Sequence, residues 1–240
     1  MSDIEPVTAQ AASSDTVSAD MIGAVTKVDR SIKVRRENDG PLINYWLYFF
    51  LLSWITLFIY PIYLYFKRIT RIDAFSERKR DYYESVLEWT QRHAEAKGRR
   101  GEVEHLVNDA RQEVRTAFDG DLRPIRAGIS LLLTIVTLGL YGIYVLYRQN
   151  RFWWDAQKLE QDFDDKLSQM WTTLGITKYP INFTIDTGKN RNFALYLVLS
   201  IVTLGVWGIV WDYKIHTDPD KLYSEYHGIE DTVLATIRTV

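Results

Sequence analysis

No cysteine occurs among the 240 residues of the chain, and histidine is scarce. Without cysteine the protein can form no disulfide, no thiolate metal site and no cysteine nucleophile. The four histidines lie far apart, and none stands in a metal-binding HxxxH or HExxH pattern. Glycine-rich phosphate loops and a GxSxG nucleophile motif are missing as well. We therefore expect no catalytic, cofactor-binding or metal site, and a protein that is not an enzyme.

A strong charge imbalance is also missing. The formal net charge is −2 at pH 7, which gives no reason to expect nucleic acid as a partner. Residues 1–20 lack both the basic start and the apolar run of a secretory signal. They are rich in Ala and Ser with scattered acidic residues. This composition predicts a disordered tail that continues through a basic linker to residue 40, with weak strand-like alternation at residues 31–35.

Apolar residues are concentrated in three blocks, at about residues 42–66, 127–147 and 193–211. The mean hydropathy of the whole chain is nevertheless slightly negative, at −0.18. Blocks of this length are unusual in a soluble core. Aromatic residues make up 14% of the chain, and many of them flank the blocks, where the surface of a bilayer favours them. The pattern predicts an all-α protein that is embedded in a membrane.

Each block contains one copy of a repeated motif. The copies are TLFIYPIYLYFK at residues 56–67, TLGLYGIYVLYR at residues 137–148 and TLGVWGIVWDYK at residues 203–214. They align without gaps as Thr-Leu-(Gly/Phe)-x-aromatic-(Gly/Pro)-Ile-x-x-x-(Tyr/Phe)-(Lys/Arg). A repeat of this kind indicates one structural unit that is built three times. We expect the unit to be an apolar block followed by an amphipathic helix.

Each block can be interpreted in two ways. A continuous helix of about 21 residues is roughly 30 Å long and would cross a bilayer once, whereas two arms of about ten residues would reach half its depth. Helix breakers at the centre of each block and basic residues at both of its ends favour a hairpin that returns to the same side. However, Gly and Pro are also common in true spans. The residues expected at the turns are Thr56, Pro61, Thr137, Gly139, Gly142, Thr203, Gly205 and Gly208.

Basic and aromatic residues at the ends of the blocks are candidates for contact with the membrane surface. Cations there would bind anionic lipid headgroups, at about 1 kcal/mol each, and Trp would lie in the interfacial belt. Asp212, at the end of the third block, is the one carboxylate within a copy of the motif, and we expect Lys214 to neutralise it. The predicted interfacial residues are Arg36, Lys67, Arg68, Arg126, Arg148, Arg151, Trp153, Trp154, Arg191, Trp211 and Lys214.

Amphipathic helices are predicted between the blocks. Residues 69–97 and 103–118 should form an antiparallel hairpin around a turn at residues 97–101. A further helix is expected around residues 159–171, then a loop at 175–191 with strand-like alternation at 181–185. The chain should break at residues 217–220, with Asp218 capping a last helix that begins at Pro219. We divide the sequence into a tail (1–40) and three membrane repeats with their helices (41–124, 125–191 and 192–240).

The stretch from Thr137 to Arg148 is similar to the signature of an uncharacterised group of small prokaryotic membrane proteins. That group is catalogued as a domain of unknown function, and its members often carry the motif more than once. The second and third copies resemble the signature well, while the first departs from it at Phe58 and Pro61. The resemblance covers about a third of the chain. It implies residence in a membrane and a prokaryotic source, and it implies no activity.

Two functional hypotheses follow. The first is a non-enzymatic integral protein of the bacterial inner membrane, with its hydrophilic helices in the cytoplasm. Its re-entrant hairpins would anchor, scaffold or shape one face of the membrane, as a homo-oligomer and with an unidentified protein partner. The alternative is a channel or transport component with three spans per protomer. Its pathway would have only Ser53, Ser130, Thr134 and Ser200 as modest polar lining.

Overall fold

The computed structural model describes residues 7–56, 59–177 and 180–240. In these ranges the chain is helical apart from turns and connecting loops, so the predicted all-α class is confirmed. The elements in chain order are α1 (Val7–Asn38), α2 (Tyr45–Leu47), the π-helical η1 (Tyr48–Leu52), α3 (Ser53–Ile55), α4 (Ile59–Ala96), α5 (Arg100–Asp119), α6 (Ala127–Val136), α7 (Leu140–Thr173), the 3-10 helix η2 (Thr187–Lys189), α8 (Phe193–Val202) and α9 (Val206–Thr239).

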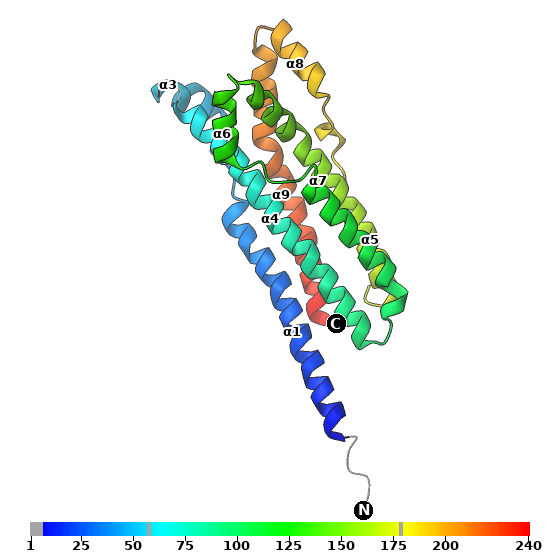
Figure 1. The fold of residues 1–240 in the computed structure, drawn as a ribbon. Helices are drawn as coiled ribbons and strands as arrows, with labels where there is room; N and C mark the ends of the chain where they lie inside the picture. Colours follow the sequence, from blue (N-terminus) through cyan, green and yellow to red (C-terminus); the bar gives the residue numbers. More distant parts are fainter. Residues whose placement is uncertain (1–6, 57–58, 178–179) are drawn as a thin grey trace, which may run out of the picture.

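Three long helices form the framework of the molecule. Helices α4, α7 and α9 contain 38, 34 and 34 residues, so each is more than about 50 Å long. Each begins inside one copy of the repeated motif and continues without interruption into the charged sequence that follows. Figure 1 shows these helices lying along one long axis, with α3, α6 and α8 gathered at one end and the start of α1 at the other. We call the end that carries the three motif turns the hairpin end.

The core lies between these helices, along the part of the bundle away from the hairpin end. Helix α4 buries Phe75, Tyr82, Val86 and Trp89 at intervals of three to seven residues. Among the contacts made, Trp89 packs edge-on against Trp171 of α7, with ring centroids 5.7 Å apart. Burying each such side chain contributes about 1.5–3 kcal/mol. This core holds the long helices together.

The predicted helical hairpin of residues 69–118 is confirmed. Helix α4 ends at Ala96, and Gly98 takes a positive φ of 67° in the turn. Helix α5 then runs antiparallel and buries an apolar stripe consisting of Val103, Val107, Ala110, Val114 and Phe118. It ends at Asp119, where the sequence Asp-Gly-Asp breaks the helical pattern.

The prediction of a disordered tail as far as residue 40 is wrong for the segment that follows Asp20. Residues 1–6 lie outside the described chain, and α1 extends from Val7 to Asn38. Ala24, Val28 and Ile32 are buried at four-residue intervals, and α1 packs along α4 and α9. The weak strand-like alternation at residues 31–35 is therefore part of a helix. Small and β-branched residues are enough for this stripe because larger side chains of the partner helices complete the core.

Two further local predictions fail. Helix α9 does not break at residues 217–220 but continues through Pro219. Asp218 caps no helix and is instead paired with Arg191, their Nη1 and Oδ2 atoms 2.6 Å apart. The loop predicted at residues 175–191 is confirmed for its described residues apart from the short η2, and residues 180–186 form no ladder with any described segment. The apolar–polar alternation of this segment arises because Ile181 and Phe183 are buried against the bundle.

The second and third apolar blocks are each divided into two helices. Helix α6 has ten residues and packs against the start of α7, and α8 likewise has ten residues and packs against the start of α9. The interpretation as single continuous helices is therefore wrong for these two blocks. None of the helices in the described part of the chain combines the length and the apolar character needed to cross a membrane.

Candidate membrane-binding end

The threonine of each motif joins the two arms of its hairpin. The Thr137 hydroxyl donates to the carbonyl oxygen of Leu133 (2.7 Å) and accepts from the backbone amide of Tyr141 (2.9 Å). In the third copy the Thr203 hydroxyl bonds the equivalent groups, four residues before and four residues after it, at 2.7 and 2.9 Å. Thr56 makes the same two bonds in the first copy, at 2.6 and 3.1 Å. One hydroxyl thus connects the end of the first arm to the start of the second.

The turn itself has left-handed backbone conformation. Leu138 and Gly139 have φ of 50° and 95°, and Leu204 and Gly205 have 49° and 93°. The Gly139 amide donates to the Thr134 carbonyl (2.7 Å), as the Gly205 amide does to the Ser200 carbonyl (2.8 Å). This is the helix-ending pattern in which glycine is strongly preferred. The turn amides are therefore paired within the hairpin, which is a requirement for backbone placed in lipid.

The Gly or Pro position three residues further on has a separate role. Pro61 is the third residue of α4, where its missing amide removes no bond within the helix. Gly142 occupies the same place in α7, and a Cβ atom there would lie 3.1 Å from Cγ2 of Thr134 in the other arm. At Gly208 the nearest atom to such a Cβ would be Oγ of Ser200, at 3.6 Å. The small residue at position 142 therefore permits close contact between the arms.

The hairpin tips are apolar and exposed. Leu138 and Leu204 have exposed fractions of 94% and 95%. Helix α8 buries none of its residues, and α6 buries only Ser130. Exposed apolar patches of this extent mark surfaces that contact another molecule or a membrane. The other exposed apolar residues of hairpins two and three include Ile129, Leu132, Ile135, Val136, Leu140, Ile143, Leu195, Val198, Ile201, Val202, Val206 and Val210.

The first hairpin differs in composition from the other two. Its first arm (residues 45–55) is rich in aromatic residues, and Trp46, Phe50 and Trp54 have exposed fractions of 49%, 66% and 69%. The rings of Trp46 and Phe50 stack with their centroids 5.7 Å apart. Two residues of its turn, Leu57 and Phe58, lie outside the described chain. All three hairpins nevertheless lie at the same end of the molecule (Figure 1), and each of them exposes apolar side chains.

The predicted interfacial residues separate into two groups. Lys67 and Arg126 are exposed, and Arg151, Trp154 and Lys214 are half-buried. The remaining described side chains are less exposed than predicted. Arg68 is half-buried and has a carboxylate partner. The buried ones are Arg148, Trp153, Arg191 and Trp211. The side chain of Arg36 lies outside the described part of the structure. Lys67 and Arg126 are the most open of the set, since Arg151 is also paired with Asp155 at 3.1 Å.

The buried members of this set stabilise the region where the hairpins join the bundle. Arg148 donates from Nη2 to the backbone oxygens of Asp121 (3.0 Å) and Arg123 (2.7 Å), which holds the loop between α5 and α6. The indole of Trp211 donates to Oδ1 of Asn150, at 2.9 Å. Trp153 packs in the core against Phe75. These are tertiary contacts between segments that are far apart in the sequence, and no local sequence pattern predicts them.

Asp212 has a different partner from the one predicted. It pairs with Arg68 of the first hairpin, while Lys214 donates to the hydroxyl of Tyr196 (3.2 Å). Nη2 of Arg68 also lies 3.3 Å from Nδ1 of His216, and the other imidazole nitrogen lies 2.8 Å from the Ile43 carbonyl oxygen. Burial and the charge of Arg68 lower the pKa of His216. The cluster links the first hairpin to the third.

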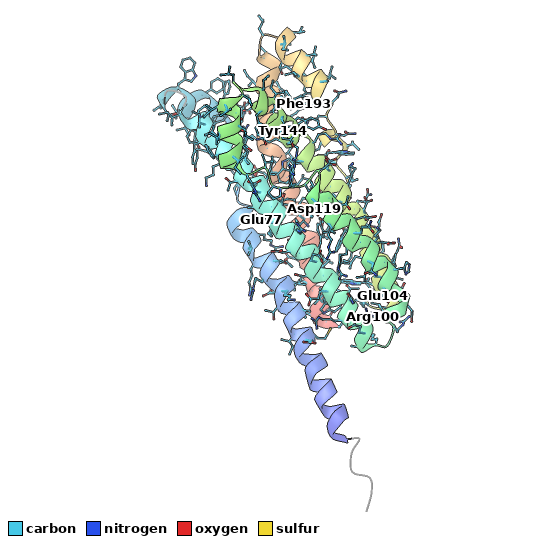
Figure 2. All side chains as sticks on the ribbon, in the orientation of Figure 1. Glu77, Arg100, Glu104, Asp119, Tyr144 and Phe193 are labelled. Atoms are coloured by element: carbon cyan, nitrogen blue, oxygen red, sulfur yellow. The ribbon has the colours of Figure 1, made fainter. Side chains whose placement is uncertain are left out.

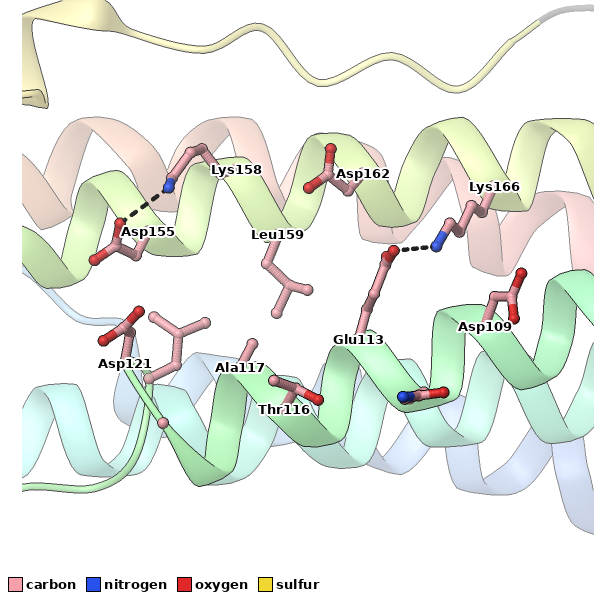
Figure 3. Close-up of a pocket in the computed structure, with 13 residues that line it drawn as sticks. Asp109, Glu113, Thr116, Ala117, Asp121, Asp155, Lys158, Leu159, Asp162 and Lys166 are labelled. Carbon is pink, nitrogen blue, oxygen red and sulfur yellow. Dashed lines mark ion pairs between the residues drawn. The ribbon is translucent and has the colours of Figure 1, made fainter.

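A separate pocket lies between α5 and α7, away from the hairpin end. It has a volume of about 620 Å³. Figure 3 shows that lysines neutralise part of its acidic lining, with Lys158 paired to Asp155 and Lys166 paired to Glu113. Among the described residues, no group of three or more His, Cys, Asp or Glu side chains could hold a metal ion. We find no arrangement in this pocket that supports a reaction.

Comparisons with known proteins identify one segment of the chain. Residues 191–237 match the family described as Domain of unknown function (DUF4234). The matched segment contains α8 and nearly all of α9, and therefore the third copy of the motif with its turn. No curated protein and no solved structure matches the chain.

Proposed function

We propose that this chain is a non-enzymatic integral membrane protein. Its three hairpins insert into one leaflet and anchor the helical bundle on that face of the membrane. The observation that carries the proposal is the position of Leu138 and Leu204. Both have the same left-handed conformation in equivalent turns, and both are almost fully exposed. The helices that these turns join, α6 with α7 and α8 with α9, meet at the hairpin end of the molecule (Figure 1). Water disfavours such a surface, whereas lipid hydrocarbon accommodates it.

The dimensions of the hairpins support insertion into one leaflet. Helices α6 and α8 have ten residues each, so each arm is about 15 Å long, or half the hydrocarbon thickness of a bilayer. The second arm of each hairpin continues into the bundle. Because both arms start from the same end of the bundle, both ends of each hairpin would lie on the same side of the membrane.

The distribution of charge supports the same orientation. Lys67, Arg126, Arg151 and Lys214 lie near the base of the hairpins, where cations would contact anionic headgroups. Figure 2 shows Tyr144 and Phe193 toward the hairpin end, with Arg100 and Glu104 at the opposite end of the bundle. An excess of Lys and Arg beside the membrane is typical of a cytoplasmic face. We therefore place the bundle in the cytoplasm, at a bacterial inner membrane.

Lateral association belongs to the same proposal. The outer faces of α6 and α8 carry exposed apolar residues along their length. Contacts between such faces of neighbouring copies would produce a homo-oligomer, which would act as a scaffold and shape that face of the membrane. The long helices would present their charged surfaces to an unidentified protein partner. The channel alternative has less support, because the hydroxyls of Ser130, Thr134 and Ser200 each donate to a backbone carbonyl four or five residues earlier in the chain.

The test uses the absence of cysteine from the natural sequence. Single cysteines replace Arg126, before the second hairpin, and Arg151, after it. Each variant is reconstituted in sealed vesicles and treated with a membrane-impermeant thiol reagent before and after permeabilisation. We expect both sites to label from the same side, and Leu138→Cys to be protected on both sides. Labelling of positions 126 and 151 from opposite sides would overturn the proposal.

A further inference from the structure

A second pocket, of about 410 Å³, lies at the base of the first hairpin. One wall is the linker at residues 40–43 and the other is a face of α4 that includes Tyr60, Tyr63, Lys67 and Arg71. We infer that this pocket binds one anionic phospholipid, with the phosphate group beside Lys67 and Arg71. The inference rests on the proposed membrane location and names the lipid that the first hairpin would select.

The charge of this pocket distinguishes it from the pocket between α5 and α7. No acidic residue lines it, whereas Asp109, Glu113, Asp121, Asp155 and Asp162 line the other. Lys67 and Arg71 are four residues apart and so lie on the same face of α4. Lys67 is exposed, and its ammonium lies 5.8 Å from the centre of the Tyr63 ring. No described carboxylate is within ion-pair distance of Lys67, so its charge is available to an anion.

Arg71 supplies the observation that points to a ligand. Its exposed fraction is 6%, its Nη2 is paired with Asp220, and its guanidinium lies over the ring of Tyr223 at 4.6 Å. Nε and Nη1 are buried and have no hydrogen-bond partner among the described residues. Buried donors are rarely left without an acceptor, because an unmade bond destabilises the fold. A phosphate oxygen in the pocket that Arg71 lines would supply an acceptor.

The rest of the lining favours a lipid over free phosphate. Leu42, Ile43 and Leu64 form an apolar part of the pocket. On the same helix, Ile59 and Ile62 are exposed toward the hairpin tip, at 69% and 53%. A phospholipid placed with its phosphate at Lys67 and its acyl chain along these residues would point in the same direction as the inserting hairpin. A pocket of this volume is within the range that holds small ligands.

The experiment compares three probes with the purified full-length protein in detergent micelles. The probes are dihexanoyl-phosphatidylglycerol, dihexanoyl-phosphatidylcholine and inorganic phosphate, and binding is measured by native mass spectrometry and thermal shift. We expect the phosphatidylglycerol to bind about tenfold more tightly than the phosphatidylcholine, and phosphate alone to bind no more tightly than the phosphatidylcholine. Lys67→Gln should remove most of this preference. Lys97→Gln is the matched control, because Lys97 is also an exposed lysine, lies in the turn after α4 at the other end of the bundle, and lines neither of the pockets described above.

Several results would overturn the inference. They are equal affinity for the two lipids, an unchanged preference in Lys67→Gln, or phosphate binding as tightly as the anionic lipid. Arg71→Gln tests the buried guanidinium. If that variant does not fold, Ala74→Leu, which fills the pocket without changing its charge, should lower phosphatidylglycerol affinity instead. Membrane insertion is tested separately, by thiol labelling in vesicles of pure phosphatidylcholine. If Leu138→Cys is protected there while the lipid preference is absent, only the lipid site fails.

Discussion

Nζ of Lys79 lies 2.7 Å from Oε2 of Glu160, and neither side chain is exposed to solvent. Lys79 is on α4 and Glu160 is on α7, and Glu230 of α9 completes the cluster at 3.0 Å from the same ammonium. The ring of Tyr226 lies 4.5 Å from it. One buried cation thus contacts a carboxylate from each of the other two long helices. Because each of these helices begins at a motif turn, the cluster ties the three repeat units together.

Removing the Lys79 ammonium should therefore lower the free energy of unfolding strongly. Lys79→Ala would leave the buried Glu160 carboxylate without its cationic partner, while Glu230 would keep Arg78 at 2.9 Å. Breaking a buried pair in this way costs about 3–5 kcal/mol. Chemical unfolding in detergent micelles, followed by circular dichroism, measures the loss. Arg100→Ala is the control, because its pairs with Glu95 and Glu104 are on the surface, and we expect it to leave the midpoint unchanged. Equal midpoints for Lys79→Ala and the natural protein would show that the cluster does not stabilise the fold.

Asp164 makes the stability of the bundle depend on pH. Burial, reinforced by the charge of Glu160, raises the pKa of Asp164 to about 9. Between the unfolded value near 4 and this folded value, the folded state binds more protons than the unfolded state, so stability falls as pH rises. Asp164→Asn should remove that fall and increase the free energy of unfolding by about 2 kcal/mol at pH 8.

At pH 4 the same substitution should have little effect, because Asp164 is protonated in the folded state there. Unfolding midpoints between pH 4 and pH 9 measure the difference. The exposed neighbour Asp165 provides the matched control, and Asp165→Asn should keep the pH dependence of the natural protein. Parallel curves for Asp164→Asn and the natural protein would contradict the prediction.

The glycines of the motif should respond differently to alanine, because they serve different purposes. Gly139 has a φ of 95° with open space around it, so Gly139→Ala is opposed by backbone strain of about 1–2 kcal/mol. Gly142→Ala would instead force a shift of Thr134, at 3.1 Å, and Gly208→Ala would meet Ser200 only at ordinary contact distance. Thermal unfolding should rank Gly208→Ala as the mildest of the three. The same loss at position 208 as at position 139 would contradict this assignment.

The tips should determine membrane affinity without affecting the fold. Leu138→Glu and Leu204→Glu change two side chains that are almost fully exposed, so the bundle should keep its unfolding midpoint. A charged residue at the centre of the hydrocarbon costs about 2.5–3.5 kcal/mol, so the double variant should bind vesicles much more weakly. Co-flotation with phospholipid vesicles measures this. Glu104→Lys, at the opposite end of the bundle, is the control for an exposed charge change (Figure 2). Unaltered flotation of the double variant would argue against tip insertion.

Local signals account for the parts of the fold that could be predicted. Thr137 and Gly139 specify a turn through bonds to residues no more than five positions away. The stripe from Val103 to Phe118 identifies α5 through its own periodicity. The same kind of reasoning failed at Pro219. There the surrounding bundle maintains the helix, and Asp218 has a distant partner in Arg191.

The sequence alone determined the repeated unit, its threefold use and its apolar character, and it favoured a hairpin over a continuous helix. Each of these depends on residues that are neighbours along the chain, so spacing and residue type are sufficient. Only the tertiary structure decided which of the basic and aromatic residues are exposed and which are buried. Arg68 pairs with Asp212, and Lys79 pairs with Glu160 and Glu230. The partners in these pairs are at least 81 residues apart in the sequence. Such pairs form where the long helices meet, and that packing is absent from any local pattern.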